Sequence, residues 1–589
     1  MKHFAAWLVA ALCLPACSSG SNHERSPTSS GGDTGAGTAG TGIPGAGNSS
    51  QGGSVTSNGG ASSSGGTGSP GGGATANGGT ASSTGGVVSV GYALNCAAPA
   101  TGSPVLRLFT RYEFENTIND VFPAIKGQWS NSLPANAVSV AGFDNDASNK
   151  PGNQFVSALV ETAESVAGSV TGTGFATLLP CSTTGDRACA DTFVTKFGLR
   201  LFRRPLTTAE HDRYLAFFDS AKAASDFKTA IKWVAAGLIQ SPNAVFRSEV
   251  GAVANGARQL TPYEVATELS YTYTGSTPDE ALLTKAAAGN LGDLVALAKA
   301  MLATEPGKRV VQRFFEGYLE YPRAAAISKT NITSPSYSSL SQAMVDETRH
   351  FVDDVILQKG GGLKQLLTAN TSNPTKDLAT YYGFPAPASD FATVTRPAGK
   401  GIGVLAQGAF LASHANSDAS SPTQRGLFPY YRLLCQPKLT APPNVPAISA
   451  AAQTNTTRER YETAHAVGGC AGCHKRFDPI GFGFEHFDEG GRYRDMQGGE
   501  AIDSASSVPG PDLNPIFSFK TQEELVTGLA GLPVTYQCFS AYMATYAFGT
   551  VESCLGQSKA AALEAGTIGI VDALAALASE PHFTQRKAQ

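Results

Sequence analysis

The sequence predicts a mainly α-helical, multi-domain protein that follows a disordered tether. Three observations lead to this fold class: apolar residues recur at one-face helical spacing, capping boxes open several of these stretches, and strand patterns are few and short. About 500 of the 589 residues follow the tether, which is too many for one ordinary domain, so several packed modules are expected.

The first residues predict export. Met1–His3 form a short basic segment, and residues 4–14 are apolar but too short to span a bilayer. Leu14-Pro15-Ala16-Cys17 resembles the lipobox of bacterial lipoproteins, which implies removal of residues 1–16 and acylation of Cys17. The alternative is an ordinary signal-peptidase site with Cys17 as a free thiol. Since Ser18 follows, the same resemblance implies an outer-membrane or cell-surface lipoprotein, facing the periplasm or the exterior.

Residues 17–92 predict a flexible tether. They consist almost entirely of Gly, Ser, Thr, Ala and Asn, so they lack the apolar surface whose burial would offset the entropy of ordering. As a coil, a segment of this length has an r.m.s. reach of roughly 45 Å. The tether therefore holds the globular body away from the membrane to which Cys17 would anchor it.

Helix signals follow in order along the body. Capping boxes begin at Thr110, Thr207 and Thr261, each with Glu three residues later, and Pro262 occupies a favoured first helical position. Amphipathic helices are also predicted over residues 230–240, 313–321 and 344–356, and breaks at Ser241-Pro242, Pro278 and 360–362. The aromatic residues of these stretches predict a protein core.

The net charge narrows the possible partners. The net charge is −4 without a basic block, which argues against a nucleic-acid partner, and no long apolar run follows the signal.

Six cysteines remain outside the signal, the lipobox and the pair described below, and six cysteines allow fifteen disulfide pairings. Short loops favour Cys181–Cys189 and Cys538–Cys554, which leaves Cys96–Cys435.

Cys470-Ala471-Gly472-Cys473-His474 is the chemically most specific stretch. C-x-x-C-H is the attachment signature of haem c: both thiols bind the haem covalently, and His474 becomes an axial ligand of the iron. In a helical turn these three side chains share one face. The alternatives are a disulfide, a redox dithiol or half of a zinc site. A zinc site would need a second close Cys/His pair, and none follows downstream.

The neighbourhood of this motif has further candidates. Thr456 to Glu459 predicts a cap for a helix that runs through His465 towards Cys470. Ile480, Phe482 and Phe484 predict an apolar wall against the porphyrin or a local core, and Arg492 and Arg494 either pair with haem propionates or face solvent. The sequence also offers three carboxyl groups as acid/base candidates, without a pocket to support them: Asp478, Glu485 and Asp488.

The sixth ligand of the iron stays unassigned. The candidates are Met543, Met496 and His465, with His414 and His486 as further possibilities. His465 lies on the same short stretch as Cys470, so a reach to the opposite haem face is awkward. A strong Met or His ligand would make an electron carrier, whereas an open position permits peroxide or oxygen chemistry.

Several segments resemble one family: Arg107–Phe122, Leu199–Tyr214, Leu238–Glu249, Gly403–Leu411 with Ser421–Gly426, and Cys470–Arg494. They are similar to the planctomycete-type cytochrome-c-like multidomain proteins, a serial array of domains of unknown function. The resemblance implies domains over residues 93–180 (1587-like), 181–252 (1595-like), 253–390 (1592-like), 391–510 (1588-like, bearing the haem) and 511–589 (1585-like). The sequence departs from the family pattern at two places. One is residues 269–274, and the other is Phe477, where relatives often have Met or Ile.

The sequence therefore predicts an exported lipoprotein with one c-type haem that exchanges electrons with a partner protein of unknown identity. Two other functions remain open. One is a haem peroxidase or oxidase that acts on an extracellular substrate, and the other is a surface scaffold or binding protein in which the haem is structural.

Overall fold

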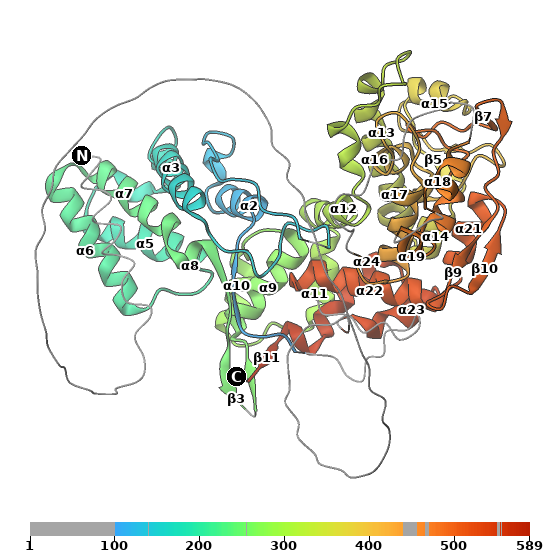
Figure 1. Ribbon diagram of the computed structural model, residues 1–589. Coiled ribbons are helices and arrows are strands. Elements are labelled where there is room, and N and C mark those ends of the chain that lie inside the picture. The colour runs from blue at the N-terminus through green and yellow to red at the C-terminus, as the bar shows by residue number, and fades with distance from the viewer. Residues whose placement is uncertain are drawn as a thin grey trace, which may run out of the picture. The chain divides into compact units, whose positions relative to one another are not determined.

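The structure is a computed structural model that describes residues 101–139, 141–254, 256–439, 456–465, 470–550, 554 and 556–588 (Figure 1). The predicted signal peptide, Cys17, the tether and Cys96 lie outside the described residues. Within them the protein is mainly α-helical, and its strands are short, as the sequence predicts.

The first helical region spans residues 105–249. Its elements are β1 (Val105–Leu108), α2 (Arg111–Val121), α3 (Asn153–Val170), α4 (Phe175–Leu178), α5 (Arg187–Phe202), α6 (Thr208–Ala224), α7 (Phe227–Gln240), α8 (Pro242–Val245) and β2 (Phe246–Glu249). Antiparallel pairing of β1 with β2 joins the two ends of this region. Apolar residues on α2, α3, α5, α6 and α7 form one buried core, to which Tyr271 from a later helix also belongs.

The second region begins with a hairpin and continues as helices. Its elements are β3 (Ala252–Ala254), β4 (Ala257–Gln259), α9 (Pro262–Thr274), α10 (Glu280–Ala287), α11 (Leu294–Leu302), α12 (Glu305–Leu319), the 3₁₀ helix η3 (Tyr321–Ala326), α13 (Tyr337–Val352), the π-helix η4 (Asp353–Gln358), α14 (Leu363–Thr368), β5 (Thr371–Ser372), α15 (Lys376–Tyr382) and β6 (Val394–Thr395). The predicted helices at 313–321 and 344–356 begin earlier than expected, at Glu305 and Tyr337.

The third region carries the cysteine motif and the C-terminus. Its elements are α16 (Gly408–Ser413), α17 (Pro422–Phe428), the π-helix η6 (Pro429–Leu433), α18 (Thr457–His465), α19 (Ala471–His474), α20 (Asp478–Phe482), β7 (Met496–Gln497), β8 (Glu500–Ala501), β9 (Ser506–Pro509), β10 (Pro515–Phe519), α21 (Gln522–Leu529), α22 (Pro533–Phe548), α23 (Ala560–Glu564), α24 (Ile570–Ala576) and β11 (Gln585–Lys587).

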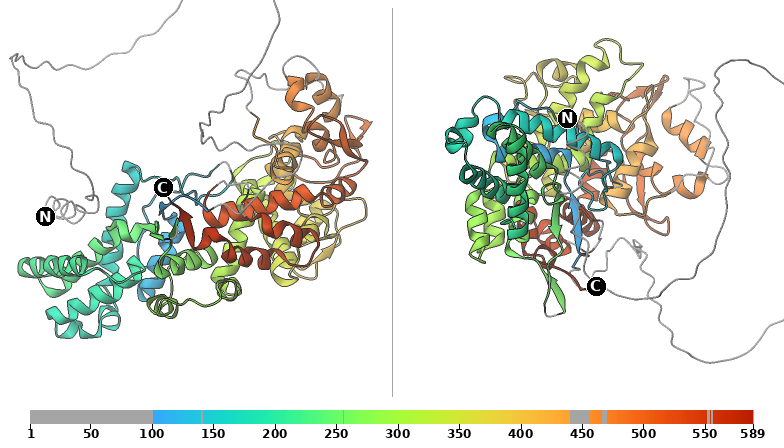
Figure 2. Two further views of the ribbon diagram at one scale, coloured as in Figure 1. Left: turned by 90° about the horizontal axis from the view of Figure 1, so that it is seen from below. Right: turned by 90° about the vertical axis from the view of Figure 1, so that its left-hand side faces the viewer.

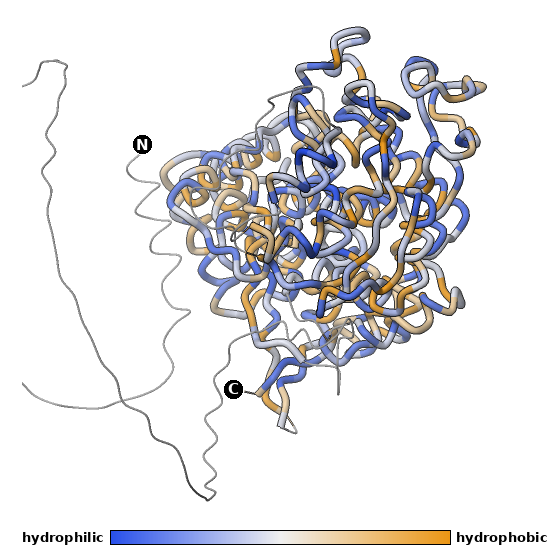
Figure 3. Tube along the Cα trace, turned by 45° about the vertical axis from the view of Figure 1, so that its right-hand side comes forward, coloured by the Kyte–Doolittle hydropathy of each residue, from blue (hydrophilic) through white to orange (hydrophobic). Residues whose placement is uncertain are grey.

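The C-terminal elements return to the middle of the chain. α24 packs on α11, α22 contacts α12, and β11 pairs antiparallel with β4 to extend the β3–β4 hairpin (Figures 1 and 2). The second and third regions share one large apolar core. Polar and apolar residues alternate along the trace in Figure 3, and none of the helices in the described part combines the length and apolar character needed to cross a bilayer.

The capping boxes explain where three helices start. At Thr110, Thr207 and Thr261 the hydroxyl accepts from the backbone N–H of the Glu three residues on, and that carboxylate accepts from the Thr backbone N–H. The predicted cap at Thr456 is also present, because Glu459 Oε2 accepts from the Thr456 backbone N–H at 2.8 Å. The helix that follows ends at His465, and residues 466–469 lie outside the described part.

The disulfides correct the predicted pairing. Cys181 is bonded to Cys189 as expected, but Cys435 is bonded to Cys538, so the predictions Cys538–Cys554 and Cys96–Cys435 are wrong. Cys538 lies on α22, and the chain turns back along this helix after its end, where Gln557 donates to the Gln537 carbonyl oxygen at 2.8 Å. The short loop between Cys538 and Cys554 therefore does not decide the partner of Cys538. The end of η6 packs against α22 instead, which brings the Cα atoms of Cys435 and Cys538 to 5.4 Å.

Candidate functional site

The cysteine motif forms one helical turn at α19. Cys470 precedes the helix with αR backbone angles, and Cys473 and His474 lie within it. Both cysteines are free thiols and partly exposed. Side chains at i, i+3 and i+4 of a helix share a face, so the two thiols and the imidazole are presented together, as covalent attachment of haem requires.

A buried carboxylate organises the imidazole of this turn. Asp478 is 4% exposed, and its Oδ2 lies 3.0 Å from Nδ1 of His474 and 2.5 Å from Nδ1 of His465. Thr423 donates its hydroxyl to the other oxygen, Oδ1, at 2.6 Å. A carboxylate oxygen accepts hydrogen bonds, so Nδ1 is the donor on both rings, and in a neutral imidazole this leaves Nε2 as the nitrogen that can bind a metal.

The two imidazoles lie against each other. Their ring centroids are 3.4 Å apart with an interplanar angle of 29°. Tyr461 contacts His465 edge-on, and its hydroxyl donates to Ser421 Oγ at 3.2 Å. Because the same carboxylate oxygen accepts from both rings, His465 lies beside His474 rather than across its Nε2. The role of His465 as a sixth ligand stays a prediction.

Close packing of α17 on α20 holds Thr423 over Asp478. A Cβ on Gly481 would lie 1.9 Å from the Pro422 carbonyl oxygen, and a Cβ on Gly426 would lie 2.0 Å from the Phe477 carbonyl oxygen. Only glycine permits backbones to approach this closely. The glycines at 426 and 481 therefore set the distance between the two helices.

Arg425 fixes the segment that follows α20. Its guanidinium is fully buried and donates to the carbonyl oxygens of Phe484, Phe487, Asp488 and Leu411 at 2.6–3.2 Å. Burial lowers the pKa of Arg425 to about 10, so it stays charged at neutral pH. One side chain thereby ties α17 to the loop that leaves the site.

The other predicted side chains near the motif have structural partners. Ile480, Phe482 and Phe484 are buried, and Ile480 and Phe484 belong to the large core. The acid/base candidates are paired as well: Arg492 with Asp488 at 3.2 Å, and Arg494 with Glu485 at 3.8 Å. Burial raises the pKa of Glu485. These groups therefore stabilise the loop after α20.

The sixth-ligand candidates lie in different surroundings. Met543 is fully buried on α22 within the large core, and Met496 on β7 is 53% exposed. Of the three, His465 is the one whose contact with His474 the structure establishes. Sequence reasoning missed that Asp478 joins these two histidines in a set whose ligand atoms lie within 4.8 Å of one another. The i, i+4 spacing of His474 and Asp478 is the signal that predicts half of this set.

A cavity of about 550 Å³ adjoins α17 on another face. Its lining comes from several elements: Ala141, Glu320, Arg323, His414, Gln424, Leu427, Phe428, Tyr431, Arg432, Cys435, Gln436, Pro437, Lys438, Ala541, Tyr542 and Thr545. Gln424 follows Thr423 directly and Leu427 lies one turn further, so the cavity and the Asp478 cluster share α17.

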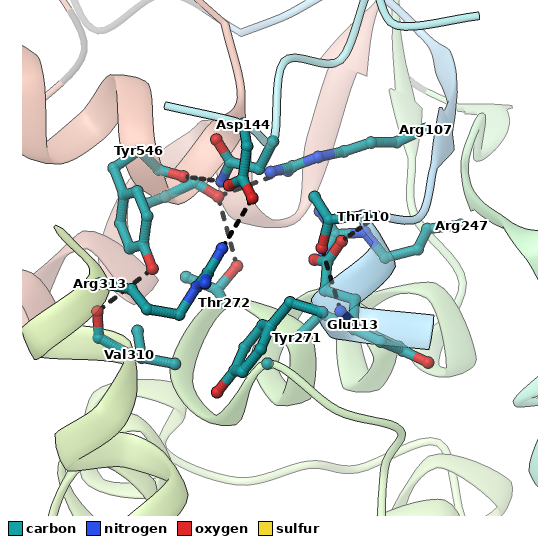
Figure 4. Close-up of a pocket in the computed structure, with 14 residues that line it drawn as sticks. Arg107, Thr110, Glu113, Asp144, Arg247, Tyr271, Thr272, Val310, Arg313 and Tyr546 are labelled. Atoms are coloured by element: carbon teal, nitrogen blue, oxygen red, sulfur yellow. Dashed lines mark hydrogen bonds and ion pairs between the residues drawn. The ribbon is translucent and has the colours of Figure 1, made fainter. Parts of the chain in front are cut away.

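A second polar cluster is buried where β1, β2 and α9 meet. Arg107 and Arg247 lie 3.6–4.0 Å from the carboxylates of Glu113, Glu249 and Glu268. Both arginines and Glu113 line a cavity of about 30 Å³, large enough for one water (Figure 4). Burial and the neighbouring Glu249 raise the pKa of Glu268.

This cluster joins elements that lie far apart in the sequence. Arg586 on β11 donates to Glu249 Oε2 at 2.6 Å, although β11 lies more than 300 residues further along the chain. Across the cavity, Arg313 pairs with Asp144 at 2.7 Å (Figure 4). A charge-assisted hydrogen bond thus joins β11 to β2, and ion pairs join β1 and β2 to α9, which gives the cluster a structural role.

Comparison with known protein families gave four matches in serial order. They are PSD3, a protein of unknown function (DUF1587), over residues 107–171; PSD5 (DUF1595) over 189–249; PSD4 (DUF1592) over 260–384; and PSCyt3 (DUF1588) over 401–497. The comparison found no match among curated proteins and none among solved structures. The 1585-like segment stays a prediction.

The order of the four matches is the one that the resemblance predicts. The cysteine turn, Asp478 and α17 all fall within the PSCyt3 match, whose name is that of a cytochrome-type domain. The chain therefore belongs to the planctomycete-type cytochrome-c-like multidomain family.

Proposed function

We propose that this protein carries one covalently bound c-type haem and transfers electrons at the cell envelope as an exported lipoprotein. The observation that carries the proposal is the Asp478 cluster. On the turn that bears two free thiols, Asp478 accepts the Nδ1 proton of His474 and leaves Nε2 with its lone pair. Histidines that bind metals almost always donate their other nitrogen in this way.

The residues present fit the cofactor. Cys470 and Cys473 would hold the porphyrin covalently, and His474 Nε2 would bind the iron, whose ferric/ferrous couple supplies one-electron chemistry. Asp478 orients the imidazole and increases its basicity. Thr423 and His465 share the Asp478 carboxylate and fix its position.

The disulfides support an oxidising compartment. Cys181–Cys189 and Cys435–Cys538 are formed, and structural disulfides persist in exported proteins. Haem c is attached after export, so this compartment agrees with the lipobox-like Cys17. Cys470 and Cys473 must stay reduced until haem is attached, which requires a maturation system in the host. The membrane contact is the lipid anchor, and the electron partner is a second protein.

One observation favours an enzyme as the second candidate. Met543 is packed in the core, Met496 is exposed, and His465 shares the carboxylate of His474. If no protein side chain occupies the sixth position, the iron is open to small molecules, and the protein would act as a haem peroxidase or oxidase on an extracellular substrate. The spin state of the ferric protein distinguishes the two candidates.

The test is a visible spectrum of protein matured in a host with c-type haem assembly. The wild type is expected to keep its Soret band after denaturation, and Cys470→Ser/Cys473→Ser is expected to lose it. Cys181→Ser/Cys189→Ser is the matched control, because it also removes two cysteines but leaves the motif intact. A sharp low-spin reduced spectrum supports electron transfer, and a high-spin spectrum that shifts with cyanide supports the enzyme. No surviving band in the wild type would overturn the proposal.

A further inference from the structure

We propose that the cavity between α17, η6 and α22 binds a small aromatic acid that carries a hydroxyl group, such as a phenolic carboxylate. Its volume of about 550 Å³ lies within the range of roughly 300–1,000 Å³ typical of small-molecule sites. Leu427, Phe428, Tyr431, Ala541 and Tyr542 give it mainly apolar and aromatic walls. Such walls suit a planar ring.

The walls are held together covalently. The disulfide Cys435–Cys538 joins the stretch after η6 to α22, and both elements line the cavity. Tyr318 donates its hydroxyl to the Arg432 carbonyl oxygen at 2.9 Å and fixes η6 on α12. A preformed cavity lowers the ordering cost that a ligand must overcome.

His414 supplies the specific acceptor. It lies at the end of α16, is 8% exposed, and donates Nδ1–H to the Phe410 carbonyl oxygen at 2.9 Å. The tautomer therefore keeps the lone pair on Nε2, for which the described residues offer no donor. Burial lowers the pKa of His414 to about 4, so the ring is neutral at neutral pH. A hydroxyl group on the ligand would donate a hydrogen bond to this nitrogen.

The rim of the cavity is cationic. Arg432 is already neutralised, because it pairs with Glu320 at 2.7 Å and lies over the Tyr542 ring. Arg323 and Lys438 are exposed and have no carboxylate partner among the described residues. Glu320, Arg323 and Lys438 also line a second cavity of about 480 Å³, so the two cavities meet at these residues. These two cations select a ligand with an acidic group.

The inference does not depend on bound haem. The cavity and the Asp478 cluster share α17, so an occupant would lie close to the cysteine motif. Binding itself is measured without any redox step. A failure of the binding test and a failure to attach haem are therefore separate results.

The experiment is calorimetric titration of the full-length protein with 4-hydroxybenzoate, benzoate and 4-hydroxybenzyl alcohol. We expect 4-hydroxybenzoate to bind one to one. Benzoate lacks the hydroxyl and should bind about tenfold more weakly, because one hydrogen bond to the buried nitrogen is lost. The alcohol lacks the acidic group, so its affinity should be lower and should not fall with added salt.

Two variants and a control test the residues. His414→Phe should abolish the preference for 4-hydroxybenzoate over benzoate, whatever it does to absolute affinity. Leu427→Trp should fill the cavity and weaken all three compounds. The control is His211→Phe on α6, which should change neither the preference for 4-hydroxybenzoate nor the affinity for any of the three compounds. The comparison between ligands on the wild type holds even if a variant folds poorly.

Three outcomes would overturn the proposal. One is equal affinity of the wild type for 4-hydroxybenzoate and benzoate, and another is no binding at millimolar ligand. The third is binding to Cys470→Ser/Cys473→Ser that disappears in the haem-loaded protein, since the cavity would then belong to the porphyrin.

Discussion

Replacement of Asp478 by Asn tests how the protein tunes the iron ligand. The carboxylate accepts from His474 Nδ1 at 3.0 Å and is 4% exposed, so its negative charge acts at close range in a weakly solvated site. A charged acceptor increases the electron donation of the imidazole and stabilises ferric over ferrous iron. Asn keeps the shape and an acceptor oxygen but removes the charge.

The magnitude follows from the strength of this hydrogen bond. A bond to a charged group contributes about 1.5–3 kcal/mol and a neutral one about 1 kcal/mol. If the difference of about 1–2 kcal/mol acts on the ferric state, the one-electron reduction potential rises by about 40–90 mV. The assay is a redox titration of the matured protein, followed at the Soret band, with Asp377→Asn on α15 as a control.

His465 provides a change of opposite sign. It donates to the same Asp478 oxygen at 2.5 Å and therefore draws charge away from His474. His465→Phe keeps a stacked ring without the donor, so the potential should fall. Unchanged potentials in both variants, or a lower potential for Asp478→Asn, would refute the role assigned to the carboxylate while leaving haem attachment untouched.

Three further predictions concern stability. Burial raises the pKa of Glu347 from 4.5 to about 7. Between these pH values the folded state keeps a proton that the unfolded state releases, so the stability of the wild type falls as pH rises from about 4.5 to 7. Glu347→Gln should remove up to about 3 kcal/mol of this fall, measured by denaturant unfolding at pH 5 and 8; equal slopes with pH would contradict the assignment. The double change Cys435→Ser/Cys538→Ser opens a loop with a sequence separation of 103 and should cost about 4–5 kcal/mol in the chain-entropy account, visible as a lower Tm. Gly481→Ala places a methyl 1.9 Å from the Pro422 oxygen and should cost about 1–3 kcal/mol, and an unchanged Tm would show that α17 and α20 are not fixed at this distance.

Local signals predicted helix starts well because they depend on neighbouring residues. Thr110, Thr207 and Thr261 form capping boxes within four residues of sequence, and no distant contact is needed to recognise them. The disulfide prediction failed for the opposite reason. Loop length favoured Cys538–Cys554, whereas tertiary packing of η6 on α22 brings Cys435 to Cys538.

The sequence locates the cysteine turn of the candidate site but not the residues that pack around it. The motif at 470–474 identifies the two thiols and His474, whereas the sequence predicts Asp478 only as an acid/base candidate and not as the partner of His474. The contribution of Thr423 depends on the approach of α17 to α20, which two separated glycines permit and no local pattern predicts. The cavity beside His414 likewise gathers residues from distant segments.

Covalent attachment of haem is the central claim, and intact-mass spectrometry of the purified, matured protein tests it most directly. The account predicts that the wild-type mass exceeds the mass of the processed chain by one haem under denaturing conditions. The excess should disappear in Cys470→Ser/Cys473→Ser and remain in Cys181→Ser/Cys189→Ser. A wild-type mass without haem, from a host that loads a known c-type cytochrome in the same culture, would contradict the account.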